Sequence, residues 1–206
     1  MYRVFAVELD HSVGEVVRLD RPNMHVGYVR DEALGPHVKR LLVGREGPDE
    51  LRGHVVRDRP DLYGHLVAAT RRRARELERT LACDLIRSWH GVFGHPRWRI
   101  YVIRLDASQQ YPESDRPWVY VGLTSKSPES RFDEHKRGAR NARGRLYNRL
   151  ARDYGTELWR ECYEDVRPCC SLDEAKDAEK ELAERLYWDK GFRVEGDGLP
   201  SEHRGR

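Results

Sequence analysis

The chain has 206 residues and a mass of 24.2 kDa, enough for one large domain or two small ones. Hydrophobic residues make up 38% and charged residues 35%, so a core can form and wholesale disorder is excluded. No apolar run approaches the roughly 18 residues of a membrane span, and 38 basic against 35 acidic residues do not identify a nucleic-acid binder.

The first ten residues lack the apolar segment of a secretory signal and already contain Glu8 and Asp10. The four cysteines show no zinc-finger spacing. We therefore expect a cytoplasmic protein with no membrane association and no structural zinc.

Three blocks of the first half recur in the second half in the same order. The first block, YRVFAVELD at residues 2–10, recurs as WRIYVIRLD at residues 98–106. Two further pairs follow, DRPNMHVGYV with DRPWVYVGLT and ARELERTLACDL with AKDAEKELAERL. Three blocks in register indicate a tandem duplication. We expect two domains, 1–95 and 96–206, which meet near a turn-rich GVFGHP segment.

In the second domain, alternating and β-rich residues predict strands at 100–105 and 118–123. These two strands are expected to pair antiparallel, with Gly122 indicating a close backbone approach. A third, short strand is predicted at 158–167.

Capping signals place the helices. Ser127 and Pro128 predict the start of a helix that ends at Gly138, and a second helix is predicted at about 145–153. Ser171 and Glu174 form a capping box at the start of the last helix. The predicted fold is α+β: two tandem small domains, each a short three-stranded, mainly antiparallel sheet flanked by helices.

One carboxylate stands on the apolar stripe of the last predicted helix. Glu179 lies between Ala175 and Leu182, and Glu78 has the same place in the first domain. A carboxylate facing a sheet needs a cation, which is either an arginine of a structural ion pair or a metal ion.

The helix that follows the second strand carries Arg131 and His135 four residues apart, on one face. Tyr101 and Tyr120 lie on the adjacent strands; taken alone, each is more typical of a core aromatic. Together with Glu179 these groups suit phosphodiester hydrolysis. Arginine stabilises phosphate charge, a carboxylate holds a divalent metal, and tyrosine or histidine orients or deprotonates water.

Residues 131–152 contain eight basic residues against two acids. Such a stripe attracts a phosphate backbone, although a solvated helical face is the alternative. The candidate nucleic-acid contacts, with one lysine from the preceding turn, are Lys126, Lys136, Arg137, Arg140, Arg143, Arg145 and Arg149.

The second domain resembles the GIY-YIG nuclease family over about residues 98–196. The two family tripeptides correspond to residues 99–101 (RIY) and 120–122 (YVG). The family arginine, histidine and metal-binding glutamate correspond to Arg131, His135 and Glu179.

This resemblance implies a DNA endonuclease with Mg²⁺ (or Mn²⁺) on Glu179, and Tyr101 as the water activator assisted by Tyr120 and His135. RNA or branched DNA is a possible substrate instead. Two positions depart from the family pattern: Arg99 stands in place of glycine, and Arg193 lies near the place of a late asparagine.

The first domain looks like a decayed copy. Phe5 matches Tyr101, His25 matches Tyr120, and Pro36 falls opposite Arg131, so that Glu78 alone remains. We expect a non-catalytic domain that packs on the nuclease or holds DNA, making the monomer an intramolecular pseudo-dimer. The alternative is that both domains form an inactive nucleic-acid-binding or protein-interaction module.

Overall fold

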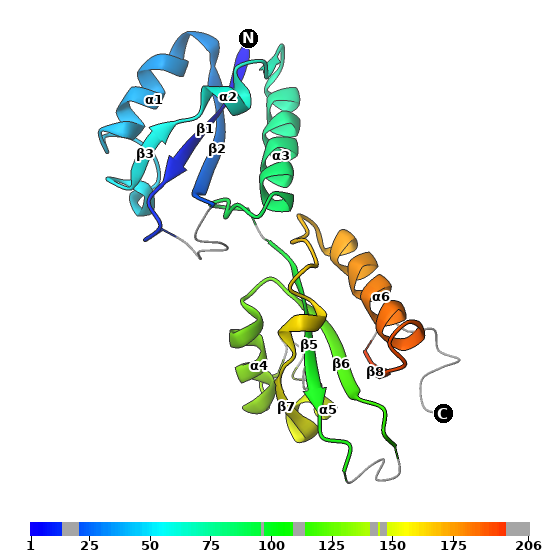
Figure 1. Ribbon diagram of the computed structural model, residues 1–206. Helices are drawn as coiled ribbons and strands as arrows, with labels where there is room; N and C mark the ends of the chain where they lie inside the picture. Colours follow the sequence, from blue (N-terminus) through cyan, green and yellow to red (C-terminus); the bar gives the residue numbers. More distant parts are fainter. Residues whose placement is uncertain (14–20, 96, 109–113, 141–143, 145–147, 197–206) are drawn as a thin grey trace. The chain divides into compact units, whose positions relative to one another are not determined.

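The structure is a computed structural model that describes residues 1–13, 21–95, 97–108, 114–140, 144 and 148–196. The chain divides into two compact units, Met1–Arg97 and Trp98–Arg206 (Figure 1). The fold is mixed α+β, with one sheet in each unit and six α-helices over the described residues.

Unit 1 has a four-stranded sheet. Strand β1 is central: β2 and β3 flank it, and the short β4 also pairs with β1. The elements in chain order are β1 (Tyr2–Leu9), β2 (Asn23–Arg30), α1 (Leu34–Leu42), β3 (Val55–Asp58), α2 (Pro60–Tyr63), β4 (Val67–Ala68) and α3 (Arg71–Arg87).

Unit 2 also has a four-stranded sheet, in the order β7-β5-β6-β8. Strand β8 runs parallel to β6, whereas the other pairs are antiparallel. The elements are β5 (Arg99–Leu105), β6 (Trp118–Thr124), α4 (Pro128–Lys136), α5 (Arg149–Tyr154), β7 (Gly155–Leu158), α6 (Leu172–Trp188) and β8 (Arg193–Glu195).

The two sheets share their register and an irregularity. Phe5 pairs with Gly27 in unit 1, and Tyr101 pairs with Gly122 in unit 2. The pairing of β1 with β3 shifts after Glu8, and the pairing of β5 with β7 shifts after Arg104. A bulge at the same place in both sheets is a specific structural sign of common architecture, because bulges are conserved features of a fold.

Helices cover both faces of the unit 2 sheet. Residues 100–103 of β5, whose side chains alternate between the two faces, are therefore all buried. His135 of α4 and Tyr154 of α5 lie against Tyr101 and Trp118, which share one face. Helix α6 lies on the other side of the strands (Figure 1). Unit 1 has the same arrangement, with α1 and α3 on opposite sides of its sheet.

Three sequence-based expectations need correction. The third strand of unit 2 is Gly155–Leu158, not 158–167, where a 3₁₀ turn at Arg160–Cys162 follows instead. The first residue of that strand has to be a glycine, because a Cβ at Gly155 would lie 2.3 Å from the Ala151 carbonyl oxygen. Each sheet has four strands, not three, since β4 and β8 add a short strand to each.

The third correction concerns the alignment of the early helices. Both α1 and α4 are nine residues long, and each is followed by a glycine with φ of 68°, Gly44 and Gly138. Only glycine takes that backbone conformation without strain, so the two glycines fix the alignment. Arg131 therefore corresponds to His37, not to Pro36, and His135 corresponds to Leu41.

Candidate active site

The site of unit 2 is built around a glycine. Tyr101 lies directly across from Gly122 in the sheet, and its ring crosses the space where a side chain would project. A Cβ at Gly122 would lie 2.6 Å from the Tyr101 hydroxyl and 2.8 Å from a ring carbon of Tyr120. The glycine of the YVG sequence is therefore what allows the two tyrosines to approach each other.

Tyr101 is buried, with 1% of its surface exposed, and its hydroxyl lies 2.8 Å from Nε2 of His135. Burial raises the pKa of Tyr101 well above its ordinary value, and Tyr120 adds to the rise, while Arg131 opposes it. Burial, with the positive charge of Arg131, also lowers the pKa of His135 to about 4. Both partners of this hydrogen bond are thus uncharged near neutral pH.

Tyr120 completes the aromatic cluster from β6. Its ring centre lies 6.1 Å from that of Tyr101 and 5.7 Å from that of His135. Tyr120 is half-buried, unlike the other two. It is therefore the phenol of this cluster that a ligand can reach most directly.

Arg131 is held by a carboxylate that the sequence analysis did not select. Its Nη1 donates to Oε2 of Glu134 at 2.9 Å, and Lys126 is bound to Oε1 of the same carboxylate. The ion pairs lower the pKa of Glu134, the Lys126 contact most. The i, i+3 spacing of Arg131 and Glu134 was a visible signal, but such pairs are common on solvated helices.

Glu179 is 7% exposed and belongs to the sheet-facing stripe of α6 with Ala175, Leu182 and Ala183. It does not point into bulk solvent. It comes, however, from the helix on the other side of the sheet from α4, which carries Arg131. A common site for these two residues has to form around the edge of the sheet.

Unit 1 indicates how such a meeting is possible. The Phe5 ring centre lies 4.9 Å from that of His37 and 5.7 Å from that of His25. Burial, then the charges of His37 and His95, lower the pKa of His25 to about 4.

His95 continues this cluster toward α3. Its Nε2 lies 3.9 Å from Oε1 of Glu78, the residue that corresponds to Glu179. Burial raises the pKa of Glu78. In unit 1, the late-helix glutamate thus lies next to His95, a histidine whose charge also acts on His25 of the aromatic cluster.

The predicted basic stripe divides into groups with different roles. Lys136 donates to the carbonyl oxygens of Arg152 (3.1 Å) and Gly155 (2.8 Å), so its ammonium ties α4 to the turn between α5 and β7. The stripe arginines that bind nearby groups on exposed surface are Arg137 with the Asp133 carbonyl, Arg140 with the Gly144 carbonyl, and Arg149 with Asp153. Arg143 and Arg145 lie outside the described residues.

Within the part of the chain that the structure describes, no group of three or more His, Cys, Asp or Glu side chains is arranged to hold a metal ion. Mg²⁺ nevertheless commonly takes only one or two protein carboxylates and completes its shell with water and substrate phosphate. The buried carboxylate of Glu179 fits such a role, with Mg²⁺ or Mn²⁺.

Comparisons with family models, curated proteins and solved structures give no match for this chain. Over the described residues, no helix has both the length and the apolar character needed to cross a membrane.

Proposed function

We propose that unit 2 is a metal-dependent endonuclease that hydrolyses DNA phosphodiester bonds by a GIY-YIG-type mechanism. The observation that supports this most is the cluster of Tyr101, Tyr120, Arg131 and His135 packed over Gly122. A hydrophobic core has no need of a mostly buried cation beside a buried phenol that is hydrogen-bonded to a buried imidazole, because such polar groups are costly to bury.

Arg131 is the group that would stabilise the phosphate. Its side chain is 17% exposed, so it is partly shielded from water, and charge-assisted hydrogen bonds are stronger there. Glu134 fixes the guanidinium on one side. Lys126, bound to the same carboxylate, brings a second cation close to the phosphate position.

Tyr120 would bind the attacking water, and His135 would accept its proton. Tyr120 is the more exposed phenol, so we assign it, rather than the buried Tyr101, to contact that water. Tyr101 holds the imidazole of His135 in place. An arriving phosphate is negatively charged, which raises the pKa of His135 and makes it a better proton acceptor.

Glu179 is the residue that would hold Mg²⁺ or Mn²⁺, which when bound stabilises negative charge on the leaving oxygen. Its carboxylate is buried on α6, and its copy Glu78 lies 3.9 Å from His95 in the cluster of unit 1. This copy supports a place for Glu179 beside the tyrosine cluster.

Unit 1 lacks the groups for this chemistry, and we propose a non-catalytic role for it. Phe5 has no hydroxyl, Leu41 stands in place of the histidine, and His37 stands in place of the arginine.

The test is cleavage by the full-length chain of a panel of duplex, single-stranded and branched DNA and RNA, with Mg²⁺ or Mn²⁺. We expect the wild type to cut DNA and Glu179→Gln to be inactive but folded. Glu181→Gln is the matched control, because Glu181 is exposed two residues further along the same helix. Full activity of Glu179→Gln would overturn the metal assignment. Binding of the panel without cleavage would instead indicate an inactive binding module.

A further inference from the structure

A second cluster of charged side chains lies in unit 1, on the face of the sheet opposite Phe5. Glu8 is an odd number of residues from Phe5 along β1, and successive side chains of a strand alternate between faces. Glu8 borders a pocket of about 430 Å³ whose other polar lining residues are His11, Arg21, Arg57, Arg59 and His90. Pockets that bind small molecules begin at about 300 Å³.

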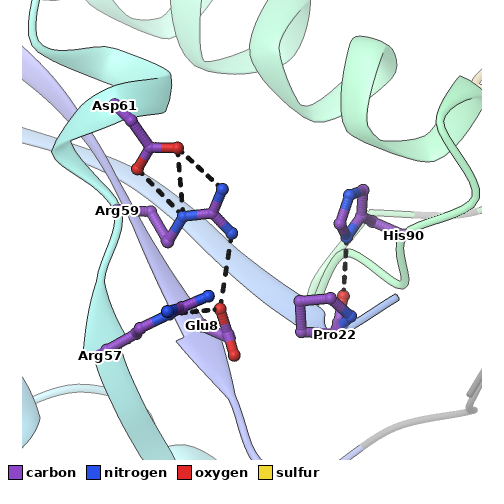
Figure 2. Close-up of polar contacts among 6 residues, drawn as sticks. All are labelled: Glu8, Pro22, Arg57, Arg59, Asp61 and His90. Carbon is purple, nitrogen blue, oxygen red and sulfur yellow. Dashed lines mark hydrogen bonds and ion pairs between the residues drawn. The ribbon is translucent and has the colours of Figure 1, made fainter. Parts of the chain in front are cut away.

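Two arginines of this pocket, Arg57 and Arg59, bind the same carboxylate, that of Glu8 (Figure 2). Arg57 donates from Nε to Oε2 of Glu8 at 2.8 Å, and Arg59 reaches the same oxygen from Nη1 at 3.4 Å. Asp61 binds Nε and Nη2 of Arg59 at 3.0 and 2.8 Å and fixes its orientation. Arg57 keeps 62% of its side chain exposed, so its guanidinium can reach a ligand.

His90 forms the buried wall of the pocket, with 8% of its surface exposed. Its Nδ1 lies 2.9 Å from the Pro22 carbonyl oxygen (Figure 2). A carbonyl only accepts hydrogen bonds, so Nδ1 carries the hydrogen. Nε2 then donates to a phosphate oxygen only when the imidazole is protonated, which the negative charge of a bound phosphate favours.

The corresponding place in unit 2 carries aromatic rings and a balanced ion pair. Arg104 stands where Glu8 does in unit 1, with its Nη1 3.4 Å from Oε1 of Glu157 and its guanidinium 5.1 Å from the centre of the Trp159 ring. Trp159 donates its backbone N–H to Val102 as Arg59 does to Ala6, and Phe192 follows α6 as His90 follows α3. The rings of Trp159 and Phe192 are stacked at 5.1 Å.

Unit 2 therefore has one arginine and one exposed glutamate at this place, whereas unit 1 gathers three arginines and two histidines around Glu8. An ion pair with an exposed partner, such as Arg57 with Glu8, contributes little to stability, about 0 to 1 kcal/mol, so stability does not account for the excess of arginines in unit 1. A ligand of opposite charge does account for it.

We propose that this pocket of unit 1 binds a phosphate group, carried by a mononucleotide or by the phosphorylated end of a nucleic acid. Arg57 and Arg21 would meet the phosphate from the exposed side, and Arg59 and His90 from the buried side. Planar guanidinium groups suit phosphate oxygens because they donate two parallel hydrogen bonds. The proposal does not depend on nuclease activity in unit 2.

Calorimetric titration of the full-length chain tests the proposal, with inorganic phosphate, AMP, adenosine, and a short oligonucleotide with and without a 5′ phosphate. The Arg131→His variant is used throughout, to weaken phosphate binding at the site in unit 2. We expect AMP to bind and adenosine not to bind. Tighter binding of the oligonucleotide with the 5′ phosphate than of both AMP and the same oligonucleotide without that phosphate would identify a nucleic-acid end as the ligand. Tighter binding of AMP would identify a free nucleotide. Equal binding of AMP and adenosine, or no binding of any phosphate, overturns the proposal.

Two substitutions of opposite sign separate a binding role from a structural one. Arg57→Gln should weaken phosphate binding about tenfold, because a charge-assisted hydrogen bond is lost. Glu8→Gln should tighten it, since a competing carboxylate is removed. Arg72→Gln, at a side chain that is 93% exposed on α3, is the control and should change nothing. If Glu8→Gln weakens binding while the protein stays folded, or if Arg57→Gln leaves it unchanged, the assignment is wrong.

Discussion

Phe5 and Tyr101 occupy the same place in two sheets of the same register, and each ring lies across a glycine of the neighbouring strand. A Cβ at Gly27 would lie 2.6 Å from Cζ of Phe5, just as one at Gly122 would lie 2.6 Å from the hydroxyl of Tyr101. The packing of an aromatic ring over glycine is thus common to both units, whereas the hydroxyl is specific to unit 2.

The early helices, α1 and α4, likewise share a buried position whose side chain differs in chemistry between the two units. Leu41 is 1% exposed and His135 is 2% exposed, so the position is a core position in both units. Leucine satisfies the core without a polar atom. A histidine here has to be held by Tyr101 at a cost in desolvation, which indicates that unit 2 keeps it for a purpose other than stability.

Substitution of unit 2 residues by their unit 1 counterparts gives variants that the scaffold already tolerates. Arg131→His and Tyr101→Phe should each keep the fold. Arg131→His should lower DNA cleavage about 10² to 10³-fold, which is typical for loss of one preorganised charge-stabilising group. Cleavage rates with saturating Mg²⁺, together with circular dichroism, check both points. Wild-type cleavage by Arg131→His would show that the arginine has no part in the reaction.

The sequence alone predicted the central strands and the last helix well, because alternation and capping signals are local. Helix α6 begins after Ser171, whose hydroxyl accepts from the Glu174 N–H as a capping box requires. Strand β7 was misplaced because only four residues form it, its burial comes from pairing with β5, and it begins at a glycine.

For the site, the residue types could be predicted but the contacts could not. Glu134 was missed because its value lies in bringing Lys126 and Arg131 together, which depends on the turn before α4. The misalignment of Arg131 with Pro36 arose because loop lengths differ between the units by single residues, and only the helix ends resolve such shifts.

The pH dependence of stability tests the cost of burying His135. The unfolded chain protonates this imidazole near pH 6.5, whereas the folded chain resists protonation until about pH 4. The free energy of unfolding should therefore fall as the pH falls from about 6.5 to about 4, by at most about 3 kcal/mol from this residue.

Chemical denaturation at pH 7.5, 5.5 and 4.5 measures this effect, and His135→Leu, which copies Leu41, should remove it from unit 2. His25 in unit 1 also has its pKa lowered to about 4, so part of the pH dependence should remain. If the His135→Leu protein loses stability on acidification as much as the wild type, the buried imidazole is not the cause.

Glycine substitutions test the packing that both units share. Gly122→Ala should lower the free energy of unfolding by about 1 to 3 kcal/mol, because the new Cβ overlaps both tyrosines. Gly27→Ala should do the same in unit 1 through Phe5.

Gly35→Ala is the matched control, since no atom lies within 4 Å of a Cβ at this position of α1. It should stabilise unit 1 by up to about 1 kcal/mol, because alanine favours a helix over glycine. Urea unfolding of the three variants checks the signs. A neutral Gly122→Ala would mean that the tyrosine rings can move aside at no cost.

The smallest expected effect concerns α5 of unit 2. At the corresponding place in the chain, unit 1 has a 3₁₀ turn, Asp49–Leu51, instead of an α-helix. Arg149 on this helix is 81% exposed. If α5 contacts the DNA backbone, Arg149→Gln should lower the slope of log affinity against log salt by about one.

Lys136→Gln should leave that slope unchanged and instead lower stability by about 1 kcal/mol, because the lysine donates to two backbone carbonyls. Fluorescence anisotropy over a salt series, with denaturation of the same proteins, distinguishes the two. An equal change of slope in both variants would mean that Lys136 leaves its carbonyl partners to bind DNA, and an unchanged slope for Arg149→Gln would remove α5 from the contact surface.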